Sequence, residues 1–333
     1  MSYALKNRSL LSLEELSASD VHFLLELARE LKRCRRAGRE QPQLRDKNIA
    51  LLCDKAPTRA HSAFEIAASE QGAKVSLIGP GDAPIGAKQS VKDTARVLGR
   101  LYDAIEVRAS EPDVVNELAS YAGVPVWNGL TDPYHPTQIL ADFLTMQEHC
   151  PDRPLAQMRV AYLGDCRRTI GESLLQGAAM LGMDFRIAAP PALWPPQILI
   201  DASQERARES GARLRFTASP MEAVEDVDFI CTDVWVSPQE PAVLWPERIA
   251  RLLPYQVNAE LLASSGNPAV KFLHGQPSAD ARAARIAEPI AHRFGSKAFE
   301  VTDDVVESPA SLLPDQAENR LHTIKALLVA TLA

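Results

Sequence analysis

The sequence has few cysteines, and none of them are paired. Five cysteines occur in 333 residues, each standing alone. A disulfide framework or a structural zinc site needs cysteines at paired spacings, so this distribution argues against both. Cys53, Cys166 and Cys231 lie in or directly after apolar segments, and we expect them to be small buried residues.

Long hydrophobic runs and blocks of like charge are also absent. No apolar stretch approaches the length of a membrane span, and the N-terminal MSYALKNRSLLSLEELS carries charges where a signal peptide is apolar. Lys and Arg total 36 against 43 Asp and Glu, for a formal net charge of -7. Because nucleic-acid binding needs a basic face, this balance disfavours it. We predict a cytoplasmic protein with small-molecule ligands that binds neither membranes nor nucleic acid.

Short apolar segments alternate with helical patterns in two series. In the first, NIALLCD, KVSLIG, AIEVRA and VPVWNG have the composition of buried strands, and a helical pattern follows each. After CPDRPLAQ, a second series contains the strand candidates MRVAYLGD, DFRIAAP, LRFTAS, DFICTDVW and VKFLHG. Alternating β and α elements form parallel sheets with helices on both faces.

The pattern therefore predicts an α/β protein with two doubly wound parallel-sheet domains. We place them at residues 1–150 and 151–313. The segment PDQAENRLHTIKALLVATLA has apolar residues at helical spacing after a proline, which predicts a closing helix over 314–333. In such folds ligands bind beyond the carboxyl ends of the strands, so the residues that follow the strands are the candidates for a site.

Three strand ends carry side chains suited to an anion or a carbonyl group. Thr58 and Arg59 open a helix after the first strand, where free N–H groups and a guanidinium favour an anion. Arg108 ends a later strand, and His135 and Gln138 share a face on the first turn of another helix. Each has a structural alternative, because threonine is a common N-cap residue and a lone histidine is often a core residue.

Several longer segments identify a family when they are taken together. They are LKNRSLLSLEEL, SVKDTARVLGRLYD, VPVWNGLTDPYHPTQILADFLTMQEH, TDVWVS, FLHGQP and DQAENRLHTIKALLVATL. With them the chain resembles the ornithine carbamoyltransferase family over nearly its whole length. The resemblance implies a first domain that binds carbamoyl phosphate and is completed by the C-terminal helix, and a second domain that binds ornithine. It also implies a homotrimer, with no metal or organic cofactor.

The resemblance assigns donor-side roles to the residues at the strand ends. Thr58 and Arg59 match the family motif S-T-R-T-R, whose arginine grips the phosphate and the carbamoyl oxygen. Arg108 matches a second arginine clamp. His135 and Gln138 match the pair that polarises and orients the carbamoyl group.

On the acceptor side, the resemblance points to the second domain and to the closing helix. Asp233 and Ser237 match residues that hold the α-amino group and orient the attacking amine. Arg320 matches an arginine of the closing helix that helps to complete the site, and we group it with the acceptor residues. The implied catalytic residues are Arg59, His135 and Asp233.

The donor-side motif departs from the family pattern. Pro57 and Ala60 stand where the family has serine and threonine, which removes two hydroxyls and one backbone N–H. In the loop GPGDAPIGAKQS, Pro84 replaces a donor-contacting glutamine, while Lys88 is retained. The loss of two or three hydrogen bonds predicts weaker phosphate binding.

The acceptor-side motifs depart from the pattern as well. Arg168 and Thr169 replace an asparagine pair, Pro238 replaces a methionine, and Gly275 and Gln276 replace the cysteine and leucine of H-C-L-P. We expect all five positions to line the acceptor site. Arg168 would either bind an additional acidic group or remain a solvated residue.

These changes fall on ligand positions and spare the scaffold, which favours altered specificity over random loss. The first hypothesis is a transferase that moves a carbamoyl-like group to or from the amine of an amino-acid-like substrate, with a non-standard donor or acceptor. The second is elimination or exchange on a ureido or guanidino amino acid without phosphate. The third is a non-catalytic trimer that binds a small amino acid.

Overall fold

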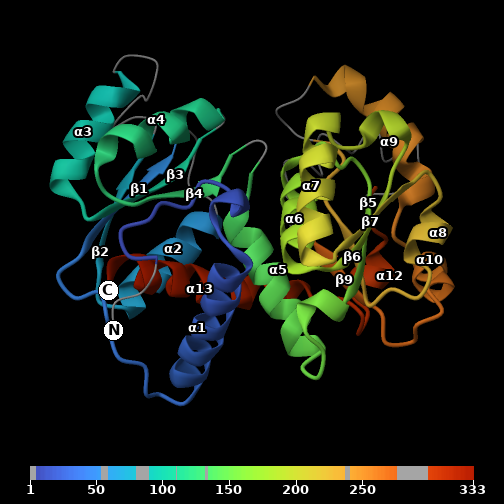
Figure 1. Cartoon of the computed structure of the whole chain (residues 1–333), viewed down its shortest axis with the longest axis horizontal. Helices are drawn as coiled ribbons and strands as arrows, with labels where there is room; N and C mark the ends of the chain where they lie inside the picture. Colours follow the sequence, from blue (N-terminus) through green and yellow to red (C-terminus); the bar gives the residue numbers. More distant parts are fainter. Residues whose placement is uncertain are drawn as a thin grey trace. The chain divides into compact units, whose positions relative to one another are not determined.

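The computed structural model of the chain (Figure 1) describes residues 5–53, 59–79, 90–109, 111–131, 134–236, 241–275 and 299–333, without the side chains of 59–61 and 242. The chain forms two compact units. Unit 1 comprises Met1–Glu148 and Gln316–Ala333, and unit 2 comprises His149–Asp315. Within the described ranges, no helix combines the length and the apolar character needed to cross a membrane.

Unit 1 contains a parallel sheet with the strand order β2-β1-β3-β4. Its strands are β1 (Asn48–Cys53), β2 (Lys74–Ile78), β3 (Ala104–Arg108) and β4 (Val126–Leu130). Its helices are α1 (Ala18–Arg36), α2 (Arg59–Glu70), α3 (Val91–Leu101), α4 (Pro112–Ala122), α5 (Pro136–His149) and α13 (Leu313–Leu332). Aliphatic side chains of α3 and α4 pack on β1 and β3, and α2 and α13 lie on the other side of the sheet (Figure 1).

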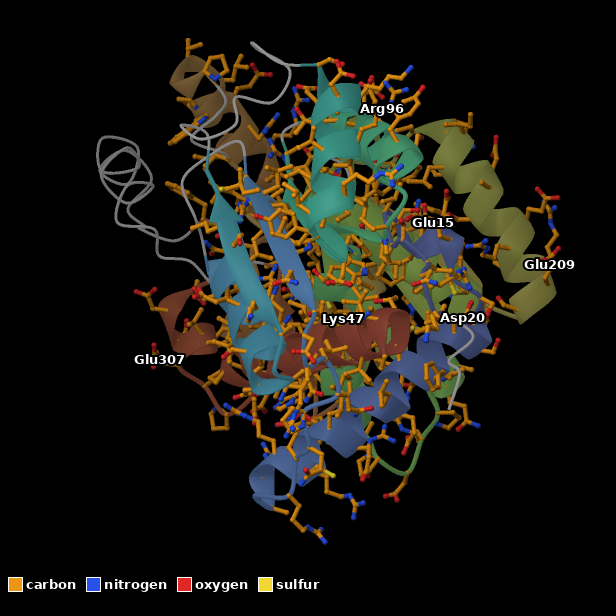
Figure 2. The ribbon with its side chains drawn as sticks, turned by 90° about the vertical axis from the view of Figure 1, so that its left-hand side faces the viewer. Glu15, Asp20, Lys47, Arg96, Glu209 and Glu307 are labelled. Carbon is orange, nitrogen blue, oxygen red and sulfur yellow. The ribbon has the colours of Figure 1, made fainter. Side chains whose placement is uncertain are left out.

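The helix α1 precedes the first strand and has no counterpart in the predicted series. It begins with a capping box, in which the Ser17 hydroxyl accepts from Asp20 N at 3.1 Å and the Asp20 carboxylate accepts from Ser17 N at 3.0 Å. Figure 2 shows Asp20 at the start of this helix. Reciprocal capping satisfies two backbone N–H groups that the helix leaves open, so the local sequence fixes where α1 starts.

The observed burial matches the prediction from the sequence for three cysteines but not for one strand. Cys53, Cys166 and Cys231 are buried, as predicted. The prediction of a buried strand for KVSLIG is wrong in one respect: β2 forms, but Leu77 is 50% exposed. The reason is that β2 is an edge strand of the sheet, and its apolar composition does not reveal whether a second strand or a helix covers it.

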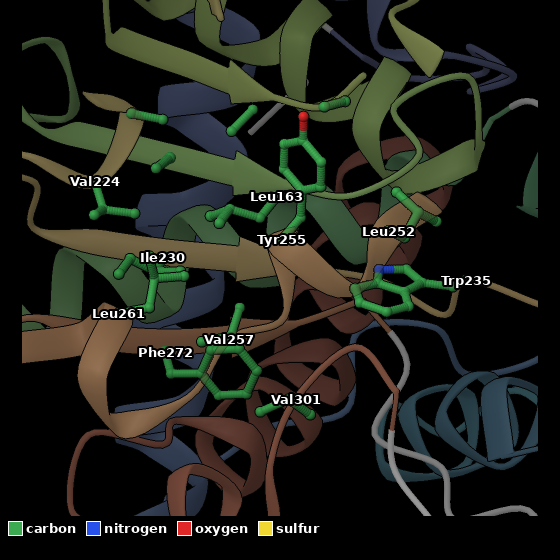
Figure 3. Close-up of a cluster of buried hydrophobic side chains, with 14 of the residues drawn as sticks. Leu163, Val224, Ile230, Trp235, Leu252, Tyr255, Val257, Leu261, Phe272 and Val301 are labelled. Atoms are coloured by element: carbon green, nitrogen blue, oxygen red, sulfur yellow. The ribbon is translucent and has the colours of Figure 1, made fainter. Parts of the chain in front are cut away.

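Unit 2 contains a parallel sheet with the strand order β7-β6-β5-β8-β9. Its strands are β5 (Arg159–Leu163), β6 (Asp184–Ala188), β7 (Arg213–Thr217), β8 (Phe229–Thr232) and β9 (Lys271–His274). Its α-helices are α6 (Thr169–Leu181), α7 (Gln197–Ser210), α8 (Pro220–Val224), α9 (Trp245–Leu252), α10 (Ala259–Ser264) and α12 (Asp303–Val306). Figure 3 shows Leu163, Ile230 and Phe272 of the sheet in one apolar core with Leu252 and Leu261.

Both sheets confirm the predicted α/β class, and each has a point where the strand order reverses. In unit 1 the reversal lies between β1 and β3, and in unit 2 between β5 and β8. At such a point the loops leave neighbouring strands toward opposite faces and open a crevice at the carboxyl ends. Any ligand site of these units is therefore expected after these strands.

The predicted closing helix, α13, packs on unit 1 through buried ion pairs. Lys325 is fully buried, and its Nζ donates to Glu40 at 2.7 Å and to Glu70 at 2.5 Å. Lys32 of α1 donates to Asn319 at 2.7 Å and to Glu148 at 2.8 Å. Breaking a buried pair by removing one partner leaves an uncompensated charge, so these contacts tie α13 firmly to unit 1.

Candidate active site

In unit 1, side chains from β3, α5 and α13 meet at the carboxyl end of the sheet. Arg108 is the last residue of β3, and the fully buried His135 immediately precedes α5. Nη2 of Arg320 on α13 contacts Nε2 of His135. Because an arginine can only donate, Nε2 accepts and the ring proton lies on Nδ1, which is 3.4 Å from the Thr137 hydroxyl.

The protonation states of this cluster follow from its burial and its cations. Burial, Arg320 and Arg108 together lower the pKa of His135 well below its ordinary value, so the imidazole is neutral at neutral pH. Burial lowers the pKa of Arg320 to about 10, with Asp142 opposing the shift and Arg108 adding to it. Arg320 therefore stays charged, and its buried Nε has no hydrogen-bond partner among the described residues.

A buried carboxylate orients Gln138. Gln138 Nε2 donates to Asp142 Oδ1 at 2.7 Å, and Gln316 Nε2 on α13 donates to the same oxygen at 2.7 Å. Asp142 is 2% exposed, so the amide of Gln138 is held by a buried carboxyl group. Asp142 and Gln316 were not predicted as site residues. The signal for Asp142 is a single acidic residue inside the otherwise apolar run ILADFLTM.

Glu106 is a second carboxyl group that the sequence analysis did not single out. It lies fully buried on β3, and a Cβ at Gly129 on the neighbouring β4 would lie 1.8 Å from its Oε1. Glycine at 129 thus makes room for the carboxyl group. Burial raises the pKa of Glu106 to about 8 against the opposing effect of Arg108 and Arg320. Among the described residues, the unit 1 cluster therefore places the cations Arg108 and Arg320 near a carboxyl group, Glu106, that is largely protonated at pH 7.

In unit 2, a second cluster forms at the carboxyl ends of β8 and β9. Asp233 follows β8 and Gly275 follows β9, and Gly275 N donates to the Thr232 carbonyl at 3.0 Å. Arg168 is the N-cap residue of α6, and Thr169 is the first residue of that helix. The strands adjoin one another and β5 precedes α6, so these residues share the reversal point of the sheet.

Asp233 provides the cluster with an open carboxylate oxygen. The side chain is 6% exposed, and its Oδ1 has no hydrogen-bond partner within the described part of the chain. Burial raises the pKa of Asp233 to about 6, while His274 and, more weakly, Arg168 lower it and Glu300 raises it. His274 Nε2 lies 3.4 Å from Glu300. A buried carboxylate that is ionised at pH 7 is suited to bind an ammonium group.

The loop from β5 to α6 is held by two local features. Gly164 has a φ of +123°, and a Cβ there would lie 2.9 Å from Trp235 Nε1, so only glycine fits. Asp165 accepts from Arg167 Nε at 3.0 Å and Nη2 at 2.8 Å, a bidentate ion pair within the loop. These contacts place the start of α6 beside Asp233.

The structure brings some predicted residues together and leaves others undescribed. Arg108, His135, Gln138 and Arg320 lie in unit 1, where Arg320, grouped above with the acceptor residues, contacts a donor-side histidine. Arg59 is the first residue of α2, without a described side chain. Arg168, Thr169, Asp233 and Gly275 lie in unit 2. The predicted residues outside the described ones are Thr58, Lys88, Ser237, Pro238 and Gln276.

Both units are parallel-sheet domains with charged side chains gathered at the carboxyl ends of the strands, an arrangement typical of α/β enzymes. Residues 8–148 match the aspartate/ornithine carbamoyltransferase carbamoyl-P binding domain, and residues 156–331 match the Asp/Orn binding domain of the same family. The chain therefore belongs to the aspartate/ornithine carbamoyltransferase family, and it is a carbamoyltransferase-type enzyme.

Individual relatives agree with this assignment over their full length. The chain is 54% identical to a catabolic ornithine carbamoyltransferase of Pseudomonas putida over 335 residues, covering 100% of this chain and 99% of that protein. A catabolic ornithine carbamoyltransferase of Burkholderia mallei is also 54% identical, with coverage of 100% and 99%. The solved ornithine carbamoyltransferase of Pyrococcus furiosus superposes with a TM-score of 0.88 at 34% identity, covering 98% of each chain.

Proposed function

We propose that the enzyme transfers a carbamoyl group between a phosphorylated carbamoyl donor bound to unit 1 and the side-chain amine of an ornithine-like amino acid bound to unit 2. We propose further that its donor or acceptor preference differs from that of an ordinary ornithine carbamoyltransferase. The observation that carries the reaction is the placement of the cations Arg108 and Arg320 at the strand ends of unit 1 and of the buried Asp233 carboxylate at the strand ends of unit 2.

The unit 1 cluster suits the charge that develops during transfer. As the amine attacks, negative charge grows on the carbamoyl oxygen and on the departing phosphate. Arg59, Arg108 and Arg320 are the cations proposed to meet this charge, and preplaced charges in a water-poor site lower the barrier most. The neutral imidazole of His135 and the Gln138 amide are proposed to polarise and orient the carbonyl group without adding charge.

The unit 2 cluster suits the amino acid. Asp233 is proposed to bind its ammonium group, which matches a buried carboxylate with an open oxygen. In the transfer itself the neutral side-chain amine forms the N–C bond, the bond from the carbamoyl carbon to the phosphate oxygen breaks, and phosphate leaves with that electron pair. The attacking nitrogen then loses one proton to solvent or to phosphate.

The altered preference is inferred from the substituted ligand positions. Pro57 and Ala60 lack the hydroxyls of the family motif, and Gly275 presents no side chain beside Asp233. Missing hydrogen bonds to a charged ligand each cost about 1.5–3 kcal/mol, so an unchanged affinity for both substrates is not expected. The missing phosphate-side hydroxyls also favour, as a second candidate, a transfer or exchange that proceeds without phosphate.

The test is a product assay with purified protein. Carbamoyl phosphate is incubated with ornithine, its shorter and longer homologues and other amines, and citrulline is incubated with and without phosphate in the reverse direction. New masses that correspond to one added carbamoyl group support the transfer. Ornithine turnover as the best reaction, at an ordinary rate, would overturn the altered preference, and phosphate-independent turnover would favour the second candidate.

We also propose that the chain assembles as a homotrimer through unit 1. Two large apolar side chains on neighbouring elements support an interface there: Ile66 on α2 is 45% exposed, and Leu77 on the edge strand β2 is 50% exposed. Light scattering after size exclusion gives the mass directly. Leu77→Glu is expected to lower it, whereas Leu101→Glu, on another helix of unit 1, serves as the exposed apolar control.

A further inference from the structure

Gly275, the first residue after β9, is buried and leaves no room for a side chain. A Cβ at this position would lie 2.5 Å from Ile170 Cγ1 and 2.9 Å from Asp233 Oδ1. Gly275 is not among the residues with positive φ, so the backbone does not require glycine. Glycine is required at position 275 only because a Cβ would clash with its neighbours, and the closest atom belongs to Ile170.

Ile170 is held rigidly at the reversal point of the unit 2 sheet. It is the second residue of α6, directly after the loop from β5, and it is 2% exposed. A β-branched side chain in a helix has essentially one χ1 rotamer, so Ile170 cannot swing away from Gly275 at low cost. A fixed, buried aliphatic side chain therefore lies at the place where an open α/β sheet binds its ligand.

The same point in space is flanked by a carboxylate and a hydrocarbon. Ile170 Cγ1 and Asp233 Oδ1 both lie within van der Waals reach of the position that a Cβ at 275 would take. A ligand that binds Asp233 with an ammonium group from this side places its adjoining atoms near Ile170. Methylene groups gain from that contact, whereas a polar substituent would lose its hydration without gaining a partner.

We propose that Ile170 determines acceptor specificity: its stiff side chain fills the volume beside Gly275 and measures the methylene chain that joins the two amino groups of the acceptor. This inference rests on the proposed function, because it concerns the amino acid bound to unit 2. Ile170 and Gly275 act as a pair, since a side chain at 275 fits only when the residue at 170 is smaller. One methylene in an apolar pocket changes kcat/KM by about 10- to 200-fold, which sets the size of the effect.

The experiment compares three diamino acids of increasing length, 2,4-diaminobutyrate, ornithine and lysine, in both binding and turnover. The variants are Ile170→Ala, Gly275→Ala and the double variant. Ile170→Ala is expected to shift the kcat/KM ratio toward the longer acceptor by at least about tenfold. Gly275→Ala is expected to weaken all acceptors at least about tenfold, and the double variant is expected to recover most of that loss because the new methyl group then has space.

Leu181→Ala, at the other end of α6 and about 16 Å away along the helix, is the matched control. It removes the same kind of buried side chain and should lower stability without changing the ranking of the acceptors. Full turnover with an unchanged ranking in Ile170→Ala, or no recovery in the double variant, would overturn the inference alone. A protein that binds acceptors, with a ranking that depends on Ile170, but forms no carbamoylated product would instead refute the transfer reaction.

Discussion

The two units differ in the charged groups that lie buried at the carboxyl ends of their strands. In unit 1, the cations Arg108 and Arg320 lie near Glu106, whose carboxyl group is largely protonated near pH 7. In unit 2, Asp233 is a buried carboxylate with an open oxygen and with His274 and Arg168 as its cationic or potentially cationic neighbours. The two arginines of unit 1 favour an anionic ligand, and the carboxylate oxygen of Asp233 that has no described hydrogen-bond partner favours an ammonium group. Buried charged groups at strand ends are typical of ligand sites.

The largest effect is expected from removing a cation of unit 1. Arg320→Ala should lower kcat/KM for the donor by about 10²- to 10³-fold, because it removes a charged donor that faces His135. Steady-state kinetics with varied donor measure the loss. Arg36→Ala is the control, since Arg36 is exposed and forms an ion pair with Glu318, which lies on the same helix as Arg320. A drop of the same size in both variants would mean that the anchoring of α13, and not the charge of the cluster, is what matters.

Removing the carboxylate of unit 2 should separate function from stability. Asp233→Asn is expected to weaken the acceptor about 100-fold and to abolish the fall in activity of the parent enzyme below pH 6. Because the pKa of Asp233 is raised in the fold to about 6, the ionised group destabilises the folded state above that pH. The variant should therefore be more stable at pH 8, by on the order of 2 kcal/mol. Urea unfolding and acceptor titration test both expectations, with Asp201→Asn on α7 as the exposed control. A loss of stability in Asp233→Asn at pH 8 would contradict a raised pKa of Asp233.

Acid should loosen unit 1 before unit 2, because of a histidine on α13. His322 is fully buried near Lys325, Lys32, Arg35 and Glu318, and burial together with Lys325 and Lys32 lowers its pKa to about 4. The unfolded chain therefore takes up this proton first as the pH falls below about 6.5, and up to about 3 kcal/mol of stability is lost by pH 4.

Hydrogen exchange at pH 7 and pH 4.5 resolves the two units, and it should show α13 opening first. His322→Gln should remove much of that pH dependence, whereas His22→Gln, at an exposed position of α1, should leave it unchanged. Equal acid sensitivity of α13 and of the unit 2 sheet would contradict the expectation that acid opens unit 1 first.

The smallest effect concerns the protonated carboxyl of unit 1. Ionisation of Glu106 above pH 8 adds a negative charge beside Arg108 and Arg320, so donor affinity should decline there by a few-fold. Glu106→Gln mimics the protonated form and should keep the affinity constant to higher pH. Donor affinity is measured by titration from pH 7 to pH 9. An equal decline of donor affinity in the parent enzyme and in Glu106→Gln would show that Glu106 does not cause it.

Sequence patterns predicted most strands and the closing helix because burial imposes a local period. They failed where long-range packing decides: KVSLIG is apolar, yet β2 lies at an edge. The candidate site shows the same division. His135 and Gln138 are visible as neighbours on one turn, whereas the bond from Gln316 to Asp142 spans 174 positions. The conflict between Ile170 and a side chain at 275 likewise exists only once α6 and β9 have packed together.

The placement of α13 has a consequence for how the protein is made. Unit 1 is the first to leave the ribosome, but it needs residues 316–333, whose buried Lys325 forms ion pairs with Glu40 and Glu70. Unit 2 is contiguous in the chain and is synthesised before those residues. Domains fold as units during synthesis, so unit 1 should start first and finish last, because Glu40 and Glu70 lack their Lys325 partner until α13 arrives. Released chains that end shortly before residue 316 should therefore contain a protease-resistant unit 2 and a protease-sensitive unit 1.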